Sequence, residues 1–203
     1  MDKELIGMTS GGIVLLSVIP YLWRVYEGKI HPNITTWSLW TLIGLILLLT
    51  YNSSGAKESI WPAVFGFTNP FMVVVLSIWK KGEIGRLNKT EQLCVFVTSA
   101  ALIMWFFMKD YRDVVQYALY VALVADVVAT VPQMIFVWES PYRDRPFAWW
   151  IFGIGYGLAI FAISEHTIAN YALPVFMTIV AFAITTPLVV YRLKKKIPLR
   201  EWI

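Results

Sequence analysis

The sequence has few charged residues and almost no cysteine or histidine. Asp, Glu, Lys and Arg make up 15% of its 203 residues, and it contains 1 cysteine and 2 histidines. A single cysteine forms no intramolecular disulfide, and no Cys/His pattern has metal-ligand spacing. The sequence also lacks a phosphate-cradling glycine loop and a recognisable Ser/His/Asp set. It therefore predicts neither an enzyme nor a metal or other cofactor.

What the sequence has instead is long apolar runs. Hydrophobic residues make up 58% of the chain, and the mean hydropathy is +0.63, more than a soluble domain of this length can bury. A helix needs about 20 apolar residues to cross roughly 30 Å of hydrocarbon. We expect an all-α integral membrane protein with seven transmembrane helices, at about 5–26, 35–53, 59–79, 92–108, 114–138, 147–163 and 168–192.

The distribution of Lys and Arg predicts how the chain is oriented. Four of the 17 (Lys3, Lys57, Lys109 and Arg112) fall on the side of the amino terminus, and the other 13 fall on the opposite side. The positive-inside rule makes the richer side cytoplasmic, so the amino terminus is expected outside and the carboxyl terminus in the cytoplasm. The run from Lys194 to Lys196 is interpreted as an anchor at lipid headgroups, and no nucleic-acid partner is expected.

The sequence contains an internal repeat with an offset of about 112 residues. Two pairs of prolines match at an offset of 112, and a tryptophan pair and a glycine pair match at 113: Pro20/Pro132, Pro62/Pro174, Trp37/Trp150 and Gly44/Gly157. Two three-helix units share one orientation only if an extra helix separates them. The sequence thus predicts parallel repeats at 1–80 and 113–203, the second with a basic tail, joined by a linker helix within 81–112.

Each unit has a proline within its first helix, and in the second unit Gln133 follows that proline, whereas Tyr21 follows Pro20 in the first. This pattern resembles the motif of the SWEET and PQ-loop superfamily of seven-helix transporters. The resemblance implies a 3+1+3 fold, a substrate between the two units, and hinges at the helix prolines, for which the candidates are Pro20, Pro132 and Pro70. Sugar carriers of that family use an asparagine in the third helix and another in the seventh. Asn69 matches the first, whereas Ala181 stands at the second position.

The residues themselves point to a polar interior site. Asp126, Thr130 and Gln133 follow helical spacing and share one helix face. A carboxylate near the middle of a membrane helix carries an insertion penalty of about 2.5–3.5 kcal/mol, which marks it as a functional candidate. We expect the substrate to contact six residues in a central, partly polar cavity: Trp37, Trp40, Asn69, Asp126, Gln133 and Trp150.

Several of these residues also have structural interpretations. Tryptophans near helix ends commonly anchor a protein at the membrane interface, which is the alternative for Trp37, Trp40 and Trp150. Asn69 could satisfy backbone groups that Pro70 frees at a kink rather than contact a ligand. Asp126 could pair with a cation or form an interhelical hydrogen bond instead of carrying a proton.

The expected function is transport of a small polar solute across the lipid bilayer by alternating access. The solute is sugar-like, nucleoside-like or amino-acid-like, with a proton as a candidate coupled ion, and the sequence leaves homo-oligomer formation open. The fold also resembles the KDEL-type retention receptors, so a sorting receptor is one alternative. The acidic Asp126 does not suit a peptide carboxylate, which favours transport. A structural membrane partner subunit is the third interpretation.

Overall fold

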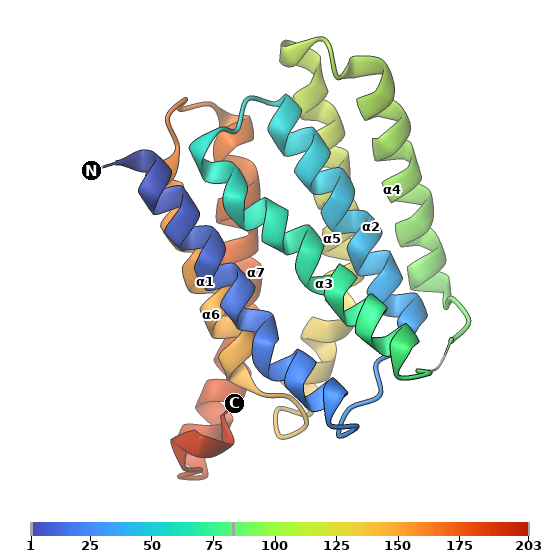
Figure 1. The fold of residues 1–203 in the computed structure, drawn as a ribbon, viewed down its shortest axis with the longest axis vertical. Coiled ribbons are helices and arrows are strands. Elements are labelled where there is room, and N and C mark those ends of the chain that lie inside the picture. Colours follow the sequence, from blue (N-terminus) through green and yellow to red (C-terminus); the bar gives the residue numbers. More distant parts are fainter. Residues whose placement is uncertain (1, 83, 203) are drawn as a thin grey trace.

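The computed structural model describes residues 2–82 and 84–202, and within them the protein is all-helical with no strand (Figure 1). Short 3-10 turns precede α3 at Glu58–Ile60, follow α6 at Ile160–Ala162 and lie near the carboxyl terminus at Leu199–Glu201. The α-helices are α1 Lys3–Tyr26, α2 Ile34–Ser53, α3 Trp61–Trp79, α4 Lys89–Met108, α5 Arg112–Glu139, α6 Pro146–Ala159 and α7 Ile168–Lys194.

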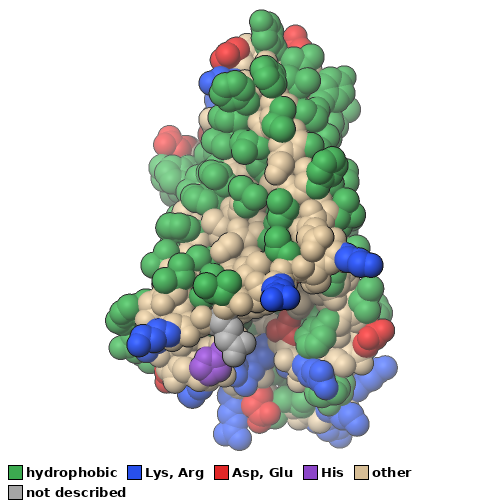
Figure 2. Space-filling model, turned by 90° about the vertical axis from the view of Figure 1, so that its right-hand side faces the viewer, with side chains coloured by type: hydrophobic (Ala, Val, Ile, Leu, Met, Phe, Trp, Pro, Cys, Tyr) green, Lys and Arg blue, Asp and Glu red, His purple; other side chains and the backbone are tan. Residues whose placement is uncertain are grey.

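Six of these helices are long and apolar enough to cross a membrane, and together they support a membrane protein. The exception is α6, which with its 3-10 turn covers only Pro146–Ala162. Its shortness has a local cause, because Pro146 starts the helix and the chain turns extended at Ile163. Figure 2 shows apolar side chains over most of the height of one face, with Lys and Arg mainly toward one end.

Asparagine side chains fix the starts of α2 and α4. Asn33 accepts hydrogen bonds from the backbone N–H groups of Thr35 and Thr36 at the start of α2. Asn88 and Glu91 form a reciprocal capping box at the start of α4. Each cap satisfies N–H groups that a helix leaves free in its first turn.

The helices form a closed ring with α4 on its outside. We call α1–α3 the first half of the bundle and α5–α7 the second half. In the first half α3 lies between α1 and α2, and in the second half α7 lies between α5 and α6. The two halves meet where α1 packs against α6 and where α2 packs against α5. The remaining helix, α4, packs against α5 and α2 (Figure 1).

The two ends of the bundle carry different connections. What we call the N-terminal end contains the start of α1 and the α2–α3, α4–α5 and α6–α7 connections. The opposite end, which we call the basic end, contains the α1–α2, α3–α4 and α5–α6 connections and the carboxyl-terminal residues.

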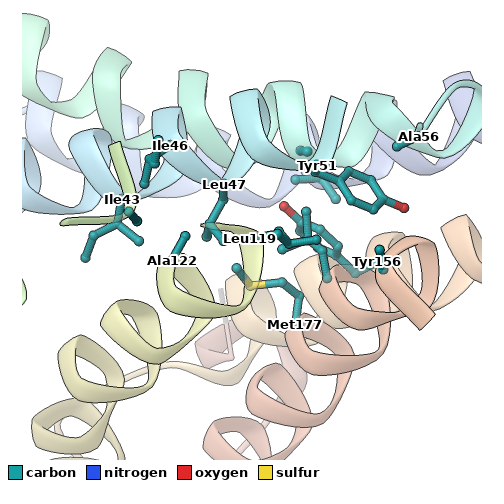
Figure 3. Packing of buried hydrophobic residues seen from close by; sticks show 14 of the residues in the cluster. Ile43, Ile46, Leu47, Tyr51, Ala56, Leu119, Ala122, Tyr156 and Met177 are labelled. Atoms are coloured by element: carbon teal, nitrogen blue, oxygen red, sulfur yellow. The ribbon is translucent and has the colours of Figure 1, made fainter. Parts of the chain in front are cut away.

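Apolar side chains fill the centre of the ring. The cluster draws on both halves of the chain and on α4, so it holds the bundle together as one core. Figure 3 shows how side chains of α2, α5, α6 and α7 converge there, among them Ile43, Leu47, Tyr51, Leu119, Ala122, Tyr156 and Met177. In a bilayer the lipid tails are as apolar as these side chains, so van der Waals packing holds such a core together.

Candidate functional site

Asp126 lies inside the bundle, halfway along α5. Only 2% of its surface is exposed, and among the described residues no hydrogen bond or ion pair reaches its carboxylate. One turn farther along the same helix, the buried Thr130 hydroxyl also lacks a hydrogen-bond partner. Two neighbouring polar groups on α5 are therefore left unsatisfied, which is costly in an apolar interior.

Asn69 is buried on α3, and only one of the two polar atoms of its side chain has a hydrogen-bond partner. Its Nδ2 donates to the carbonyl oxygen of Val14 in α1 at 2.9 Å, whereas its Oδ1 has no partner. The amide therefore ties α1 to α3 rather than capping groups freed within its own helix by Pro70. Its oxygen remains an available hydrogen-bond acceptor inside the first half of the bundle.

Gln133 takes part in a network at the basic end rather than at the centre. Its Nε2 donates to Asp144 Oδ2 at 2.8 Å, and Trp149 Nε1 donates to the same oxygen at 3.2 Å. The guanidinium group of Arg192 donates to the main-chain carbonyls of Pro141 and Asp144. The network ties the α5–α6 loop to α5, α6 and α7.

The three candidate tryptophans occupy different environments. Trp37 and Trp40 are half-buried on α2, and the ring of Trp37 lies 5.0 Å from that of Tyr21 in α1. Trp150 is 47% exposed on the outer face of α6. Consecutive helical residues point about 100° apart, so the inward position at this level belongs to its neighbour Trp149. The structure does not bring Trp150 together with Asp126.

The candidate hinge prolines are also dispersed. Pro20 is half-buried in α1, Pro70 is buried in α3, and Pro132 is exposed on α5. Each lies inside its helix, where it removes one backbone donor. Pro20 lines a hollow in the surface.

That hollow lies at the basic end, and it is not the central cavity expected from the sequence. It has a volume of about 530 Å³ and is open to the outside. Its lining comes from α1, the α1–α2 loop and the start of α6: Ile19, Pro20, Trp23, Arg24, Glu27, Lys29 and Arg145. The expected position at the centre is occupied by the apolar side chains of Figure 3.

Polar contacts join the two halves only toward the N-terminal end, within the described residues. Five such contacts join one residue of the first half to one residue of the second. They are Lys3 with the Ile163 carbonyl (2.7 Å), Tyr51 with the Asn170 carbonyl (2.9 Å), Glu58 with Ser164 (2.6 Å), Tyr156 with the Pro62 carbonyl (3.0 Å) and Lys57 with Glu165 (3.4 Å). We call this set the latch.

Glu165 is the charged centre of the latch, because it contacts both Lys57 and Arg112. The hydrogen bond from Arg112 lowers the pKa of Glu165 below its ordinary value of 4.5. A lowered pKa means that these contacts stabilise the structure above pH 4.5 and are lost as the pH falls through the folded-state pKa. Both ion pairs of Glu165 are accessible to solvent, so salt weakens their attraction.

The chain was compared with family models, with curated proteins and with solved structures. None of the three comparisons finds a match. Among the described residues there is also no group of three or more His, Cys, Asp or Glu side chains placed to hold a metal ion.

Sequence patterns did not single out several residues that the structure makes prominent. Tyr156 crosses from α6 to α3, and Asp144 organises the α5–α6 loop. Glu165 joins the two halves of the bundle. Tyr156 sits between two glycines in the sequence and Asp144 between two arginines, but neither pattern specifies which distant segment the side chain will meet.

Proposed function

We propose that this chain is a SWEET-like membrane transporter that moves a small polar solute by alternating access. The two moving units are α1–α3 and α5–α7, which correspond to the parallel repeats at 1–80 and 113–203, and α4 links them. The amino terminus is placed outside and the carboxyl terminus in the cytoplasm, because the basic end holds most of the Lys and Arg.

The neighbour relations of the helices support two equivalent units. If α1, α2 and α3 correspond to α5, α6 and α7, then α3 between α1 and α2 matches α7 between α5 and α6. The contact of α1 with α6 then matches that of α5 with α2. A two-fold axis along the membrane normal relates contacts in this way, as expected for parallel repeats.

One pair of glycine contacts supports the same correspondence at the level of residues. A Cβ added to Gly44 of α2 would lie 2.8 Å from the carbonyl oxygen of Gly66 in α3. A Cβ added to Gly157 of α6 would lie nearest to Thr178 of α7, at 3.6 Å. Gly157 and Thr178 are the positions that the repeat offsets assign to Gly44 and Gly66.

The unequal interface between the units is the observation that carries the proposal. The latch holds the units together at the N-terminal end, whereas the basic end has an open hollow of about 530 Å³ and, among the described residues, no polar side-chain contact between the units. An interface closed at one end and loose at the other is what one state of a rocking transporter requires. In this proposal the solute path opens to the cytoplasm between the two units at the basic end, and Pro20 and Pro132 flex when the units exchange states.

The buried polar groups supply the solute contacts in this proposal. Asp126 provides a carboxylate and Asn69 a free amide oxygen, both within the apolar interior. Acceptors of this kind suit a hydroxylated or cationic solute, and Asp126 is the one that a proton would neutralise. Trp37 and Trp40 offer ring faces on α2, and Gln133 contributes at the basic end. Trp150 is the weakest member of this set because of its exposure.

Uptake into proteoliposomes tests the proposal. Labelled sugars, nucleosides and amino acids are offered to vesicles that contain the purified chain, with empty vesicles as the control. We expect one class to accumulate faster than in empty vesicles, and we expect the Pro20→Ala, Pro132→Ala double variant to fold but transport more slowly. Uptake no faster than in empty vesicles for every class would instead favour the receptor or subunit interpretation.

A further inference from the structure

The hollow at the basic end has an unusual combination of walls. Ile19, Pro20 and Trp23 of α1 form an apolar side, and Arg24 and Arg145 bring two guanidinium groups to it from different halves of the chain. Its volume of about 530 Å³ exceeds what a single ion would fill. It lies on the outside of the contact between α1 and the start of α6.

No carboxylate in the described part of the protein forms an ion pair with the two guanidinium groups of this hollow, although the charges of Glu27 and Glu201 act on Arg24 and Arg145 from farther away. Neither Arg24 nor Arg145 has a carboxylate within 4.0 Å, and Arg24 Nε is buried without a hydrogen-bond partner. Glu27, the only acidic residue of the lining, is paired with Lys29 at 2.7 Å. Burial, with Arg24 and Arg192 nearby, lowers the pKa of Arg145. Arginine stays protonated even so, so the hollow presents two cations that repel one another.

The apolar side of the hollow continues along the outer face of α1. Leu16, Ile19 and Trp23 follow one another at helical spacing and are 54%, 49% and 61% exposed. An exposed apolar stripe that ends at two cations matches the two parts of a phospholipid, with acyl chains against the stripe and a headgroup at the arginines. Free phosphate would use the cations but leave the stripe uncovered.

We propose that this hollow binds the phosphate headgroup of an anionic lipid between Arg24 and Arg145, with an acyl chain along Leu16, Ile19 and Trp23. Guanidinium groups match phosphate geometry and form charge-assisted hydrogen bonds with it. Anionic lipids concentrate in the cytoplasmic leaflet, which is the leaflet proposed for the basic end. The bound lipid would bridge α1 and α6, which form one of the two main helix–helix contacts between the halves of the bundle.

Native mass spectrometry of the whole chain in detergent tests this site. Phosphatidylglycerol and phosphatidylcholine of equal acyl length are offered together to the wild type, to Arg24→Gln, Arg145→Gln and to Arg24→Lys, Arg145→Lys. The control, Arg86→Gln, Lys89→Gln, removes the same charge from exposed positions between α3 and the first residue of α4, at the same end of the bundle. We expect the wild type and the control to retain phosphatidylglycerol over phosphatidylcholine, the Gln variant to retain it about tenfold less, and the Lys variant to be intermediate.

Three results would overturn the assignment. One is equal retention of phosphatidylglycerol by the wild type and the Gln variant, and another is no preference over phosphatidylcholine in the wild type. The third is displacement of the lipid by millimolar inorganic phosphate, which would show that the cations bind free phosphate. Thermal melting checks that each variant is folded, and if the double Gln variant is not, Arg145→Gln alone is expected to lower retention about threefold.

Discussion

Asp126→Asn is expected to abolish the pH dependence of transport while the protein still inserts and folds. Asparagine keeps the size and most of the hydrogen-bonding capacity of aspartate but cannot take up or release a proton. Asp126 is the buried carboxylate of α5, with no hydrogen bond or ion pair among the described residues. An uncompensated charge is costly at this depth, so the group needs a proton or a cationic solute group when the path is closed.

Initial uptake rates over a pH series in proteoliposomes provide the measurement. Asp113→Asn is a matched control, because Asp113 is exposed in the first turn of the same helix. We expect the control to keep the wild-type profile and Asp126→Asn to give a flat one. If Asp126→Asn transports normally with its profile intact, Asp126 serves as an uncharged interhelical hydrogen-bonding group, and the coupling hypothesis ends.

Gly44→Ala is expected to lower the free energy of unfolding by about 1–3 kcal/mol, the usual cost of overpacking a tight core. The added Cβ would lie 2.8 Å from Gly66 O and 2.9 Å from Phe67 Cα. Both atoms belong to the α3 backbone, so α2 and α3 would have to move apart. The gain of about 0.5–1 kcal/mol in helix propensity on replacing glycine offsets only part of this cost.

Gly157→Ala is the matched control, because it makes the same change at the corresponding position of α6. Its Cβ would meet Thr178 at 3.6 Å or more, which is ordinary contact. We expect thermal melting in detergent to show a lower midpoint for Gly44→Ala and an unchanged or higher midpoint for Gly157→Ala. Equal effects at the two glycines would show that the close approach of α2 and α3 does not limit stability.

The helical class and the position of most helices follow from the sequence. Long apolar runs separated by charged loops suit a bilayer, and a chain that crosses a bilayer must satisfy its backbone hydrogen bonds internally, as a helix does. The predicted helices at 5–26 and 168–192 fall within α1 and α7 as the structure has them. The shortness of α6 was not evident from hydropathy, since residues 160–163 are apolar and only their backbone leaves the α-helix.

The site was less predictable than the fold. The burial of Asp126 and Asn69 follows from their places in apolar helices, and both are buried. The closed centre could not be foreseen, because it depends on how side chains of α2, α5 and α7 fill the space between the halves. The latch could not be foreseen either, since its partners are separated by 94 residues or more and several of its hydrogen bonds go to main-chain carbonyls.

Reversible cross-linking of the latch during uptake tests alternating access most directly. Lys57→Cys and Glu165→Cys replace a contact of 3.4 Å between the units, in a Cys94→Ala background that leaves only the introduced thiols. A short bifunctional methanethiosulfonate reagent joins them, and a monofunctional reagent is the control. Uptake is expected to stop when the pair is linked, to continue with the monofunctional reagent, and to return when a reductant cleaves the link. Unchanged uptake by fully linked protein would contradict alternating access between these two units.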